Sequence, residues 1–398
     1  MKTSWRSTRS KKVLYVNGEI GPSTVKYFTK NLPLMILDLK ELVECESTSG
    51  KVEQLNACAK IIYEIIRKRT GLKPEIIKLK DGTEAISFSV GPNTGRAILL
   101  LCHYDTVFPE GTLKRRPFRV SGDRIEGPGV FDMKAGLVQG VWAIKFLLEH
   151  VHANQRILFL ITPDEETGSL QSRKLIEEAG KNATLGIVLE PSENGKLKTG
   201  RKGVGTYEIT VLGKAAHAGL HPEDGISAIL EILHIVEKLS ELQDLSRGTT
   251  INVGTISGGT ATNVVPDRAT ISVDVRITGP DEAKRIDESI HSMKPQNHEA
   301  KITITGGINR LPMVKNERTL AVLEEVKKIG AGLDITIEDI SVGGGSDGNI
   351  IAQYGIPVID GMGAVGSGAH SDSEFVIASS VPKRTALLAC TLLEFNLT

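Results

Sequence analysis

The sequence has no excess of charge of either sign. Lys and Arg together number 48, as do Asp and Glu, so the formal net charge of the 398-residue chain is zero. A protein whose main partner is a nucleic acid or an anionic membrane carries a basic excess, because that partner is polyanionic. The charge balance therefore argues against both kinds of partner.

The chain also lacks long apolar runs and paired cysteines. No run of about 18 apolar residues is present, so we expect no membrane-spanning segment. The four cysteines are Cys45, Cys58, Cys102 and Cys390, and none belongs to a CxxC pair. We interpret them as free thiols and expect a cytoplasmic protein, since a reducing compartment keeps thiols free. The basic residues within 2–12 precede no apolar stretch of signal-peptide length, so we interpret them as a solvated start.

Short apolar runs alternate with amphipathic segments in the first half of the chain. The runs at 97–102, 156–161 and 185–189 are typical of strands covered on both faces. Helices are predicted between them, over 135–150 and 170–179. This β-α-β-α-β order predicts an α/β fold with a mostly parallel sheet and helices on both faces.

Other segments extend this pattern at both ends. Residues 31–70 have apolar positions at helical spacing. Near the C-terminus a helix is predicted over 319–330, with strands over 335–340 and 355–360. We therefore assign residues 1–202 and 313–398 to one larger α/β domain.

The middle of the chain has a different order of elements. The segments alternate as β-α-β-β-α-β, which is the order of the ferredoxin-like unit. The strands are predicted over 204–212, 250–257, 269–278 and 301–305, and the helices over 225–242 and 280–293. We predict that residues 203–312 form an α+β domain inserted into the larger one.

Acidic and histidine residues gather where the apolar runs end. HYDT (103–106) follows the first run, DEETG (164–168) the second, and Glu190 ends the third. FDMKAG (131–136) begins a helix, and GAHSDSE (368–374) lies in a late loop. Because the carboxyl ends of parallel strands meet at one edge of a sheet, we expect these side chains to converge.

The residue types in these segments suit a metal. A single Asp or His at a strand end is more often a helix cap or a hydrogen-bonded polar group. Five such segments within one β/α pattern favour a metal site instead. Imidazoles with carboxylates and no thiolate suit zinc, with cobalt or manganese as alternatives.

Six segments together resemble a known family. They are HYDT, GPGVFDMKAG, PDEETGS, VLEP, KAAHAG and GAHSDSE. In this order and spacing they resemble the dizinc metallopeptidases that include glutamate carboxypeptidase, aminoacylase and succinyl-diaminopimelate desuccinylase. The resemblance extends from residue 35 to the end, and HAGLHPEDGISA is most similar to the glutamate carboxypeptidase branch. It implies a zinc exopeptidase-like fold.

The resemblance implies a set of metal ligands for two zinc ions per chain. His103 and Glu190 would bind one zinc, and Glu166 and His370 the other, with Asp132 as the bridge. The family often has a cis peptide bond after the bridging residue, which here is Asp132–Met133.

The same resemblance implies two catalytic residues beside the metals. Glu165 matches the general base, although adjacent acids such as Glu165 and Glu166 could exchange roles. Asp105 matches the carboxylate that orients His103. Such a carboxylate fixes the tautomer and direction of a ligating imidazole.

Residues of the inserted domain match substrate-contacting positions of the family. His217 in KAAHAG corresponds to a histidine that reaches the active site of the partner subunit, so a homodimer through the inserted domain is implied. Asn263, Arg276 and Arg310 fall where the family binds the substrate's carboxylate or carbonyl. Arginine suits this role because its planar fork matches a carboxylate.

The expected reaction is zinc-dependent hydrolysis of an amide bond next to a free C-terminal carboxylate, which releases an amino acid. The substrate would be a small peptide or an N-acyl amino acid. An N-acyl-amino-acid amidohydrolase is the alternative enzyme, and an inactive metal- or peptide-binding relic of the fold is the non-enzymatic alternative. A flavodoxin-like nucleotide binder is disfavoured, since no glycine-rich turn follows the first strand.

Overall fold

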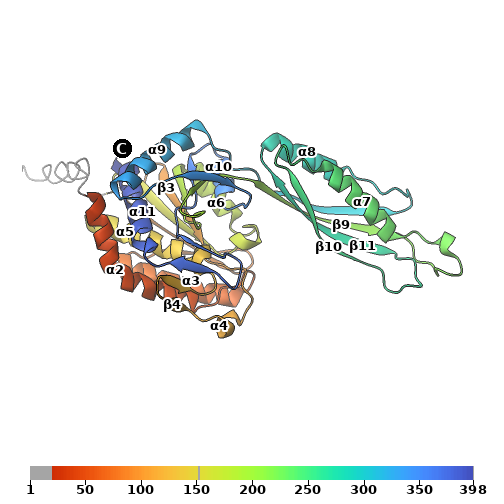
Figure 1. Cartoon of the computed structure of the whole chain (residues 1–398), viewed down its shortest axis with the longest axis horizontal. Helices are drawn as coiled ribbons and strands as arrows, with labels where there is room; N and C mark the ends of the chain where they lie inside the picture. Colours follow the sequence, from red (N-terminus) through yellow and green to blue (C-terminus); the bar gives the residue numbers. More distant parts are fainter. Residues whose placement is uncertain (1–19, 151–152, 398) are drawn as a thin grey trace, which may run out of the picture. The chain divides into compact units, whose positions relative to one another are not determined.

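The computed structural model describes residues 20–150 and 153–397, so the basic start of the chain lies outside the described residues. The chain divides into two compact units (Figure 1). One contains residues up to 199, 315–340 and 346–398, and the other contains 200–314 and 341–345. The short segment 341–345, which the sequence places in the larger domain, is grouped with the smaller unit.

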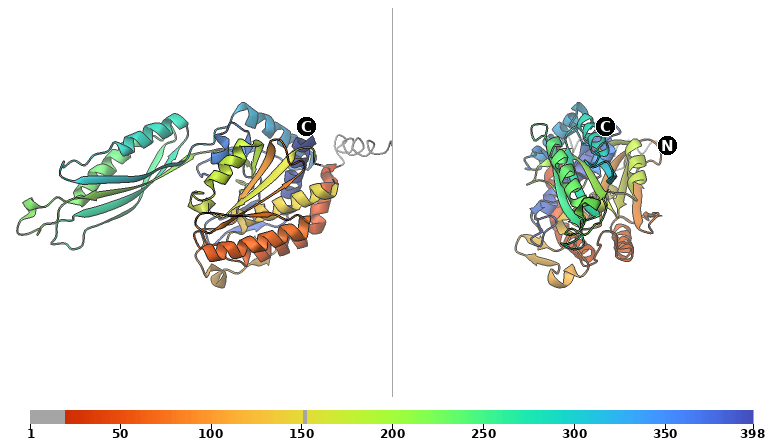
Figure 2. Two further views of the ribbon diagram at one scale, coloured as in Figure 1. Left: turned by 180° about the vertical axis from the view of Figure 1, so that it is seen from behind. Right: turned by 90° about the vertical axis from the view of Figure 1, so that its right-hand side faces the viewer.

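A six-stranded sheet organises the first unit (Figure 2). In spatial order its strands are β1 (Glu75–Lys78), β2 (Glu84–Val90), β6 (Arg156–Thr162), β3 (Ala97–His103), β7 (Ala183–Val188) and β14 (Val358–Ile359). The last four are parallel to one another, whereas β2 is antiparallel to both of its neighbours, β1 and β6. Every residue of β3 is buried, because helices and loops cover both of its faces. The mostly parallel α/β sheet is therefore confirmed.

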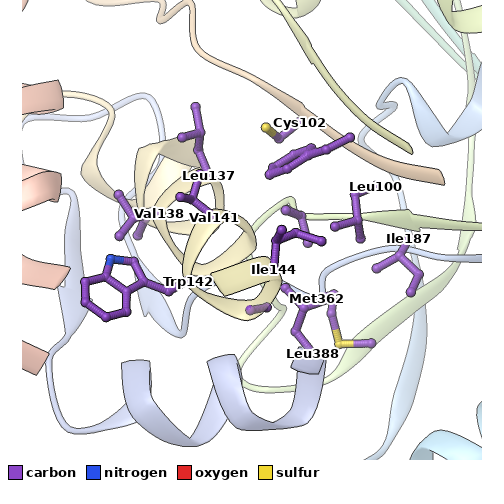
Figure 3. Packing of buried hydrophobic residues seen from close by; sticks show 14 of the residues in the cluster. Leu100, Cys102, Leu137, Val138, Val141, Trp142, Ile144, Ile187, Met362 and Leu388 are labelled. Atoms are coloured by element: carbon purple, nitrogen blue, oxygen red, sulfur yellow. The ribbon is translucent and has the colours of Figure 1, made fainter. Parts of the chain in front are cut away.

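Helices surround this sheet, and most of them pack on it and complete the core. They are α2 (Ile20–Val43), α3 (Val52–Thr70), α4 (Thr112–Arg115), α5 (Ala135–His150), α6 (Arg173–Lys181), α9 (Glu317–Gly332), α10 (Gly348–Ala352) and α11 (Ser380–Leu397). Figure 3 shows Ile144 of α5, Leu388 of α11 and Leu100 of β3, which belong to one buried hydrophobic cluster. Each fully buried aliphatic side chain of this kind contributes about 1.5–3 kcal/mol. No helix within the described part of the chain is long and apolar enough to cross a membrane.

Two predicted elements of this unit differ from the structure. The helical prediction for residues 31–70 holds for α2 and α3 and fails only over 44–51, where the chain leaves the helical path. There the Ser47 hydroxyl donates to the Tyr104 carbonyl (2.7 Å) in the loop after β3, which replaces helical hydrogen bonding. The strand predicted over 335–340 is instead β13 (Asp339–Val342), which pairs with β8 (Leu197–Arg201) and not with the parallel sheet.

A small second sheet of this unit was not predicted. Its strands are β15 (Gly366–Ser367), β16 (Phe375–Ile377), β5 (Arg124–Glu126) and β4 (Arg119–Ser121), in this spatial order. The pairing of Phe375 with Glu126 joins segments that are far apart in the sequence. It holds the loop 368–374 beside the segment that precedes α5.

The second unit has the ferredoxin-like order that the sequence predicts. Its strands are β9 (Gly203–Leu212), β10 (Thr250–Gly258), β11 (Arg268–Ile277) and β12 (Lys301–Arg310), and its longer helices are α7 (Ala228–Leu242) and α8 (Pro280–His291). The antiparallel sheet has the order β10-β11-β9-β12. Along β11, buried and more exposed residues alternate, because one face packs on the helices and the other faces away from them.

Candidate metal centre

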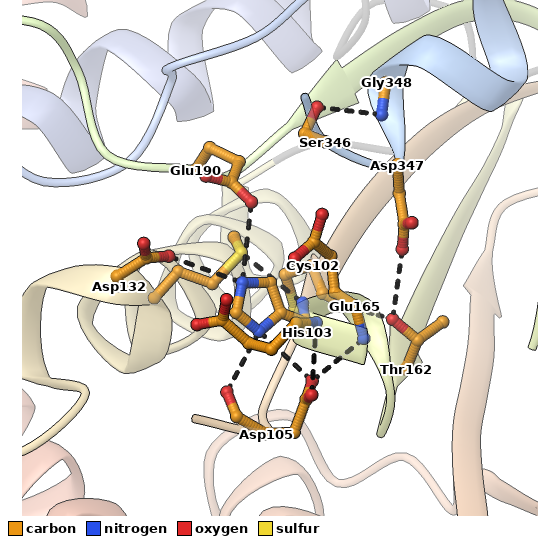
Figure 4. A network of polar contacts seen from close by, with 12 residues as sticks. Cys102, His103, Asp105, Asp132, Thr162, Glu165, Glu190, Ser346, Asp347 and Gly348 are labelled. Carbon is orange, nitrogen blue, oxygen red and sulfur yellow. Dashed lines mark hydrogen bonds and ion pairs between the residues drawn. The ribbon is translucent and has the colours of Figure 1, made fainter. Parts of the chain in front are cut away.

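Parallel strands bring the predicted ligand residues to one edge of the first unit's sheet. His103 is the last residue of β3 and pairs with Thr162 at the end of β6. Glu165 follows β6 by three residues, and Glu190 follows β7 by two. Asp132 lies in the turn that leads into α5, and His370 lies in the loop between β15 and β16. Figure 4 shows His103 facing Asp132, Glu165 and Glu190.

Asp132 lies between the two imidazoles. Its Oδ1 is 3.4 Å from Nε2 of His103, and its Oδ2 is 3.3 Å from Nε2 of His370. Each imidazole also faces a second carboxylate. The His103 nitrogen is 3.5 Å from Oε1 of Glu190, and the His370 nitrogen is 3.2 Å from Oε2 of Glu166. Two groups of three side chains thus share Asp132.

Both adjacent glutamates reach the cluster. Ligand atoms of His103, Asp132 and Glu166 lie within 4.8 Å of one another, as do those of His103, Glu165 and Glu190. The peptide bond between Asp132 and Met133 is cis, as the family resemblance implies. The distances alone allow either Glu165 or Glu166 to bind a metal.

The atoms that converge here fit a divalent cation. Within the described chain, His103 Nε2, Asp132 Oδ1 and Glu166 Oε1 are buried without a hydrogen-bond partner. The contact between His103 and Asp132 is close enough for a hydrogen bond but lacks its geometry. Buried polar atoms of this kind are costly unless something binds them. Imidazole nitrogens and carboxylate oxygens are a donor set that suits zinc, cobalt or manganese.

The neighbouring carboxylates raise the pKa values of both histidines. Contacts with Asp132 and Glu166 raise the pKa of His370 to about 11. Burial alone would lower the pKa of His103, but Asp105, Asp132 and Glu190 raise it well above its usual value. The two imidazoles in turn lower the pKa of Asp132, against the effect of its burial. A metal must displace these imidazole protons, so its binding releases protons.

Asp105 holds His103 and the backbone of the two adjacent glutamates in place. Its Oδ1 lies 3.3 Å from Nδ1 of His103, which directs the opposite nitrogen of the ring toward Asp132. The same carboxylate accepts the backbone N–H of Glu165 (3.1 Å) and of Glu166 (3.2 Å). Asp105 is fully buried. It therefore fixes both an imidazole and the two adjacent glutamates.

Sequence reasoning missed Glu374 and Arg116. The buried Glu374 carboxylate accepts backbone N–H groups from the segment that carries Asp132, and Arg116 contacts Glu374. Glu374 is the last residue of the GAHSDSE segment, and its closeness in sequence to His370 could have indicated a role in the site. Its partners lie more than 240 residues away, and no local pattern identifies them.

The remaining predicted residues lie in the second unit, whereas the cluster is built from the first. Arg276 of β11 and Arg310 of β12 both pair with Val204 of β9, one on each side. The Arg276 guanidinium donates through Nε (2.8 Å) and Nη2 (2.9 Å) to the carboxylate of Asp274. The two arginines therefore lie at the same end of one sheet.

His217 and Asn263 lie side by side in exposed loops of the second unit. Ala218 N–H donates to the Asn263 carbonyl (3.0 Å), and His217 forms a bridge with Val264. His217 Nδ1 accepts the N–H of Gly219 (3.1 Å). Because this nitrogen acts as the acceptor, a neutral ring carries its proton on Nε2.

Comparisons with known proteins agree with this architecture. Residues 199–299 match the family described as Peptidase dimerisation domain. The chain is 30% identical to Carboxypeptidase G2 of Pseudomonas sp. (strain RS-16) over 378 residues, which cover 92% of this chain and 91% of that protein.

Solved structures share the fold. One is the M20 family metallo-carboxypeptidase Sso-CP2 from Sulfolobus solfataricus (TM-score 0.73, 18% identity, 92% of this chain and 99% of that chain). Another is the Bacillus subtilis YXEP protein, described as a dinuclear metal-binding peptidase of the M20 family (TM-score 0.64, 16% identity, 93% and 99%).

Together these findings define the class of protein as a hydrolase of the metallo-exopeptidase kind. The chain belongs to the M20 family of metallopeptidases.

Proposed function

We propose that this protein is a zinc-dependent carboxypeptidase that cleaves an amide bond next to a free C-terminal carboxylate and releases an amino acid. The observation that carries this proposal is the position of Asp132, whose two oxygens each face a different imidazole. Two metals that share one carboxylate lie about 3.5–4 Å apart in hydrolytic enzymes. His103 and Glu190 would hold one ion, and His370 and Glu166 the other.

Two metal ions bound here would lower the pKa of a shared water and stabilise negative charge on the scissile carbonyl oxygen. Glu165 is the proposed general base. It is buried beside His103, and its backbone is fixed by Asp105. Its carboxylate takes the proton of the attacking water and returns it to the nitrogen of the leaving amine.

Recognition of the free carboxylate is assigned to the second unit. Arg276 and Arg310 lie on either side of Val204, and Asn263 lies next to His217. Guanidinium groups bind carboxylates through two parallel N–H donors, which favours a terminal carboxylate over a neutral amide. The similarity to a protein named as a carboxypeptidase supports the same substrate class.

The proposed dimer uses the second unit, which matches a dimerisation domain. The first unit would then be catalytic, and His217 of the partner subunit would donate a hydrogen bond to the carbonyl oxygen of the substrate. The four cysteines are free. This fits a reducing compartment, and we place the protein in the cytoplasm.

Two assays test the proposal on the purified protein. Chelation should abolish hydrolysis, and zinc should restore it together with two bound ions per chain. Dipeptides with a free C-terminus should then be cleaved far faster than the same peptides with a C-terminal amide. Full turnover by metal-free protein would refute the metal mechanism. Equal rates on both peptides would refute the carboxypeptidase assignment, and cleavage of N-acyl amino acids alone would identify an amidohydrolase.

A further inference from the structure

Glu374 joins two segments that carry candidate metal ligands. Its side chain is fully buried and accepts the backbone N–H of Gly129 through Oε2 (2.9 Å). Its Oε1 accepts the N–H of Phe131 (2.8 Å) and the N–H of Asp132 itself (2.9 Å). One carboxylate therefore fixes the backbone from which the shared ligand Asp132 projects.

Arg116 holds the second of these two segments, the loop that carries His370 and Glu374. Its Nη1 donates to the Ser371 carbonyl (3.2 Å) and lies 3.7 Å from Oε2 of Glu374. Its Nη2 donates to the Glu374 carbonyl. Ser371 directly follows His370, so the guanidinium holds the loop on the C-terminal side of that imidazole. The Arg116 side chain is only 12% exposed, so this is a largely desolvated contact.

The backbone of His370 needs such support. His370 has a φ of 62°, in the left-handed region that side chains other than glycine rarely adopt. The Ser371 hydroxyl closes the same loop by donating to the Gly368 carbonyl (2.8 Å). A backbone of this kind persists only where its surroundings fix it.

We propose that Glu374 is a positioning residue that sets the distance between Asp132 and His370, and so sets the affinity for the metal those two residues share. This inference rests on the proposed two-metal function. Among the described residues, Glu374 forms no hydrogen bond or ion pair with either imidazole or with the Asp132 carboxylate. Residues of this kind, which support ligands without binding the metal, change metal affinity by about 10- to 100-fold when they are replaced.

Glu374→Gln is the test variant. An amide keeps one acceptor oxygen but places an NH₂ group against a backbone N–H, so one of the three hydrogen bonds becomes a contact between two donors. We expect zinc affinity, measured by titration of the metal-free full-length protein against a competing chelator, to fall about 10- to 100-fold for one of the two ions. Excess zinc should restore most of the kcat, because every ligand side chain is still present.

Glu231→Gln is the matched control. The buried Glu231 carboxylate also accepts backbone N–H groups, from Gln296 (2.6 Å) and Asn297 (3.1 Å). All three residues lie in the second unit, so the control loses a similar contact away from the ligand segments and from Arg116. Thermal unfolding of both variants shows whether their losses of stability are comparable. Zinc affinity of Glu231→Gln should equal that of the wild type.

The outcomes separate this inference from the proposed function. Zinc binding by Glu374→Gln that is as tight as by Glu231→Gln would overturn the positioning role. A wild-type chain that binds fewer than two ions would instead refute the two-metal proposal. If Glu374→Gln fails to fold, Arg116→Gln replaces it. Releasing the Ser371 carbonyl should weaken the same ion, and unchanged affinity in that variant would also overturn the inference.

Discussion

Glu165 and Glu166 are neighbours in the sequence, but the structure gives them different surroundings. Glu166 contacts His370 at 3.2 Å, which suits a ligand, and Glu165 faces the other side of the cluster near Glu190. We predict that Glu165→Gln keeps both metals and lowers kcat by about 10²–10⁴, the usual contribution of a general base. Glu166→Gln should lose or loosen one metal. Metal content and kcat measured on both variants check the assignment, and the reverse pattern would exchange the two roles.

Asp274 determines which part of Arg276 can bind a substrate. Its carboxylate occupies Nε and one N–H of Nη2, so the outward edge formed by Nη1 and Nη2 is the one that can face a second carboxylate. We predict that Asp274→Asn raises KM for free-acid peptides about tenfold, equivalent to about 1.4 kcal/mol of binding, with little change in kcat.

The control for this prediction is Glu208→Gln. Glu208 pairs with Ser272, two residues from Asp274 on the same strand, so it lies on the same face of the sheet. The Glu208→Gln substitution removes an equal charge from that face and leaves the contact between Asp274 and Arg276 unchanged. A lower KM in Asp274→Asn would show the opposite role, in which Asp274 competes with the substrate for the guanidinium.

Most residues of the candidate site could be found from the sequence, for a physical reason. His103, Glu165 and Glu190 each follow an apolar run, and parallel strands align their carboxyl ends at one edge. Glu374 and Arg116 could not be found in this way. Both residues act through contacts with backbone groups of distant segments. Because nearly every residue type carries the same backbone groups, the sequence does not show which residues are contacted.

The elements around the site pack with little spare room. An added Cβ at Gly136, in the first turn of α5, would lie 2.0 Å from the carbonyl oxygen of Leu189. Leu189 precedes Glu190, and Gly136 follows Asp132 by four residues, so this contact joins two ligand segments. We predict that Gly136→Ala lowers the free energy of unfolding by about 1–3 kcal/mol and weakens zinc binding.

Gly332→Ala serves as the control for that helix substitution. Gly332 ends α9, and an added Cβ there meets nothing within 4 Å. Alanine should be neutral or slightly stabilising at this position, because it loses less backbone entropy than glycine. Denaturant unfolding of both variants checks the pair, and equal stability would show that α5 can shift to accommodate the extra carbon.

The spacing of apolar residues predicted the elements that bury one regular face or are buried on both faces. The inserted unit was predicted in full order, because its strands alternate between a packed and an open face. The break between α2 and α3 and the small sheet of β15, β16, β5 and β4 were missed. These features depend on contacts such as that between Ser47 and Tyr104, which join segments distant in the sequence.

At the scale of the whole molecule, the proposed active site needs a second copy of the chain. His217 is exposed in a loop of small residues, and Gly219 N–H occupies its Nδ1, so Nε2–H is available as a donor. A donor that stabilises an oxyanion contributes about 2.7–4 kcal/mol to catalysis. His217→Ala should therefore lower kcat by about 10²–10³ and leave the metal content unchanged.

Mixed dimers distinguish a role in the partner subunit from a role in the same subunit. His217→Ala and Glu165→Gln chains are each expected to be nearly inactive alone. If His217 acts on the partner subunit, one site of each mixed dimer contains both residues and the other contains neither. In an equal mixture about half of the dimers are mixed, so activity should return to about a quarter of the wild-type value. If His217 acts within its own chain, every site lacks one of the two residues and the mixture stays inactive. An inactive mixture, with subunit exchange verified by native mass measurement of tagged chains, would therefore refute the action of His217 on the partner subunit.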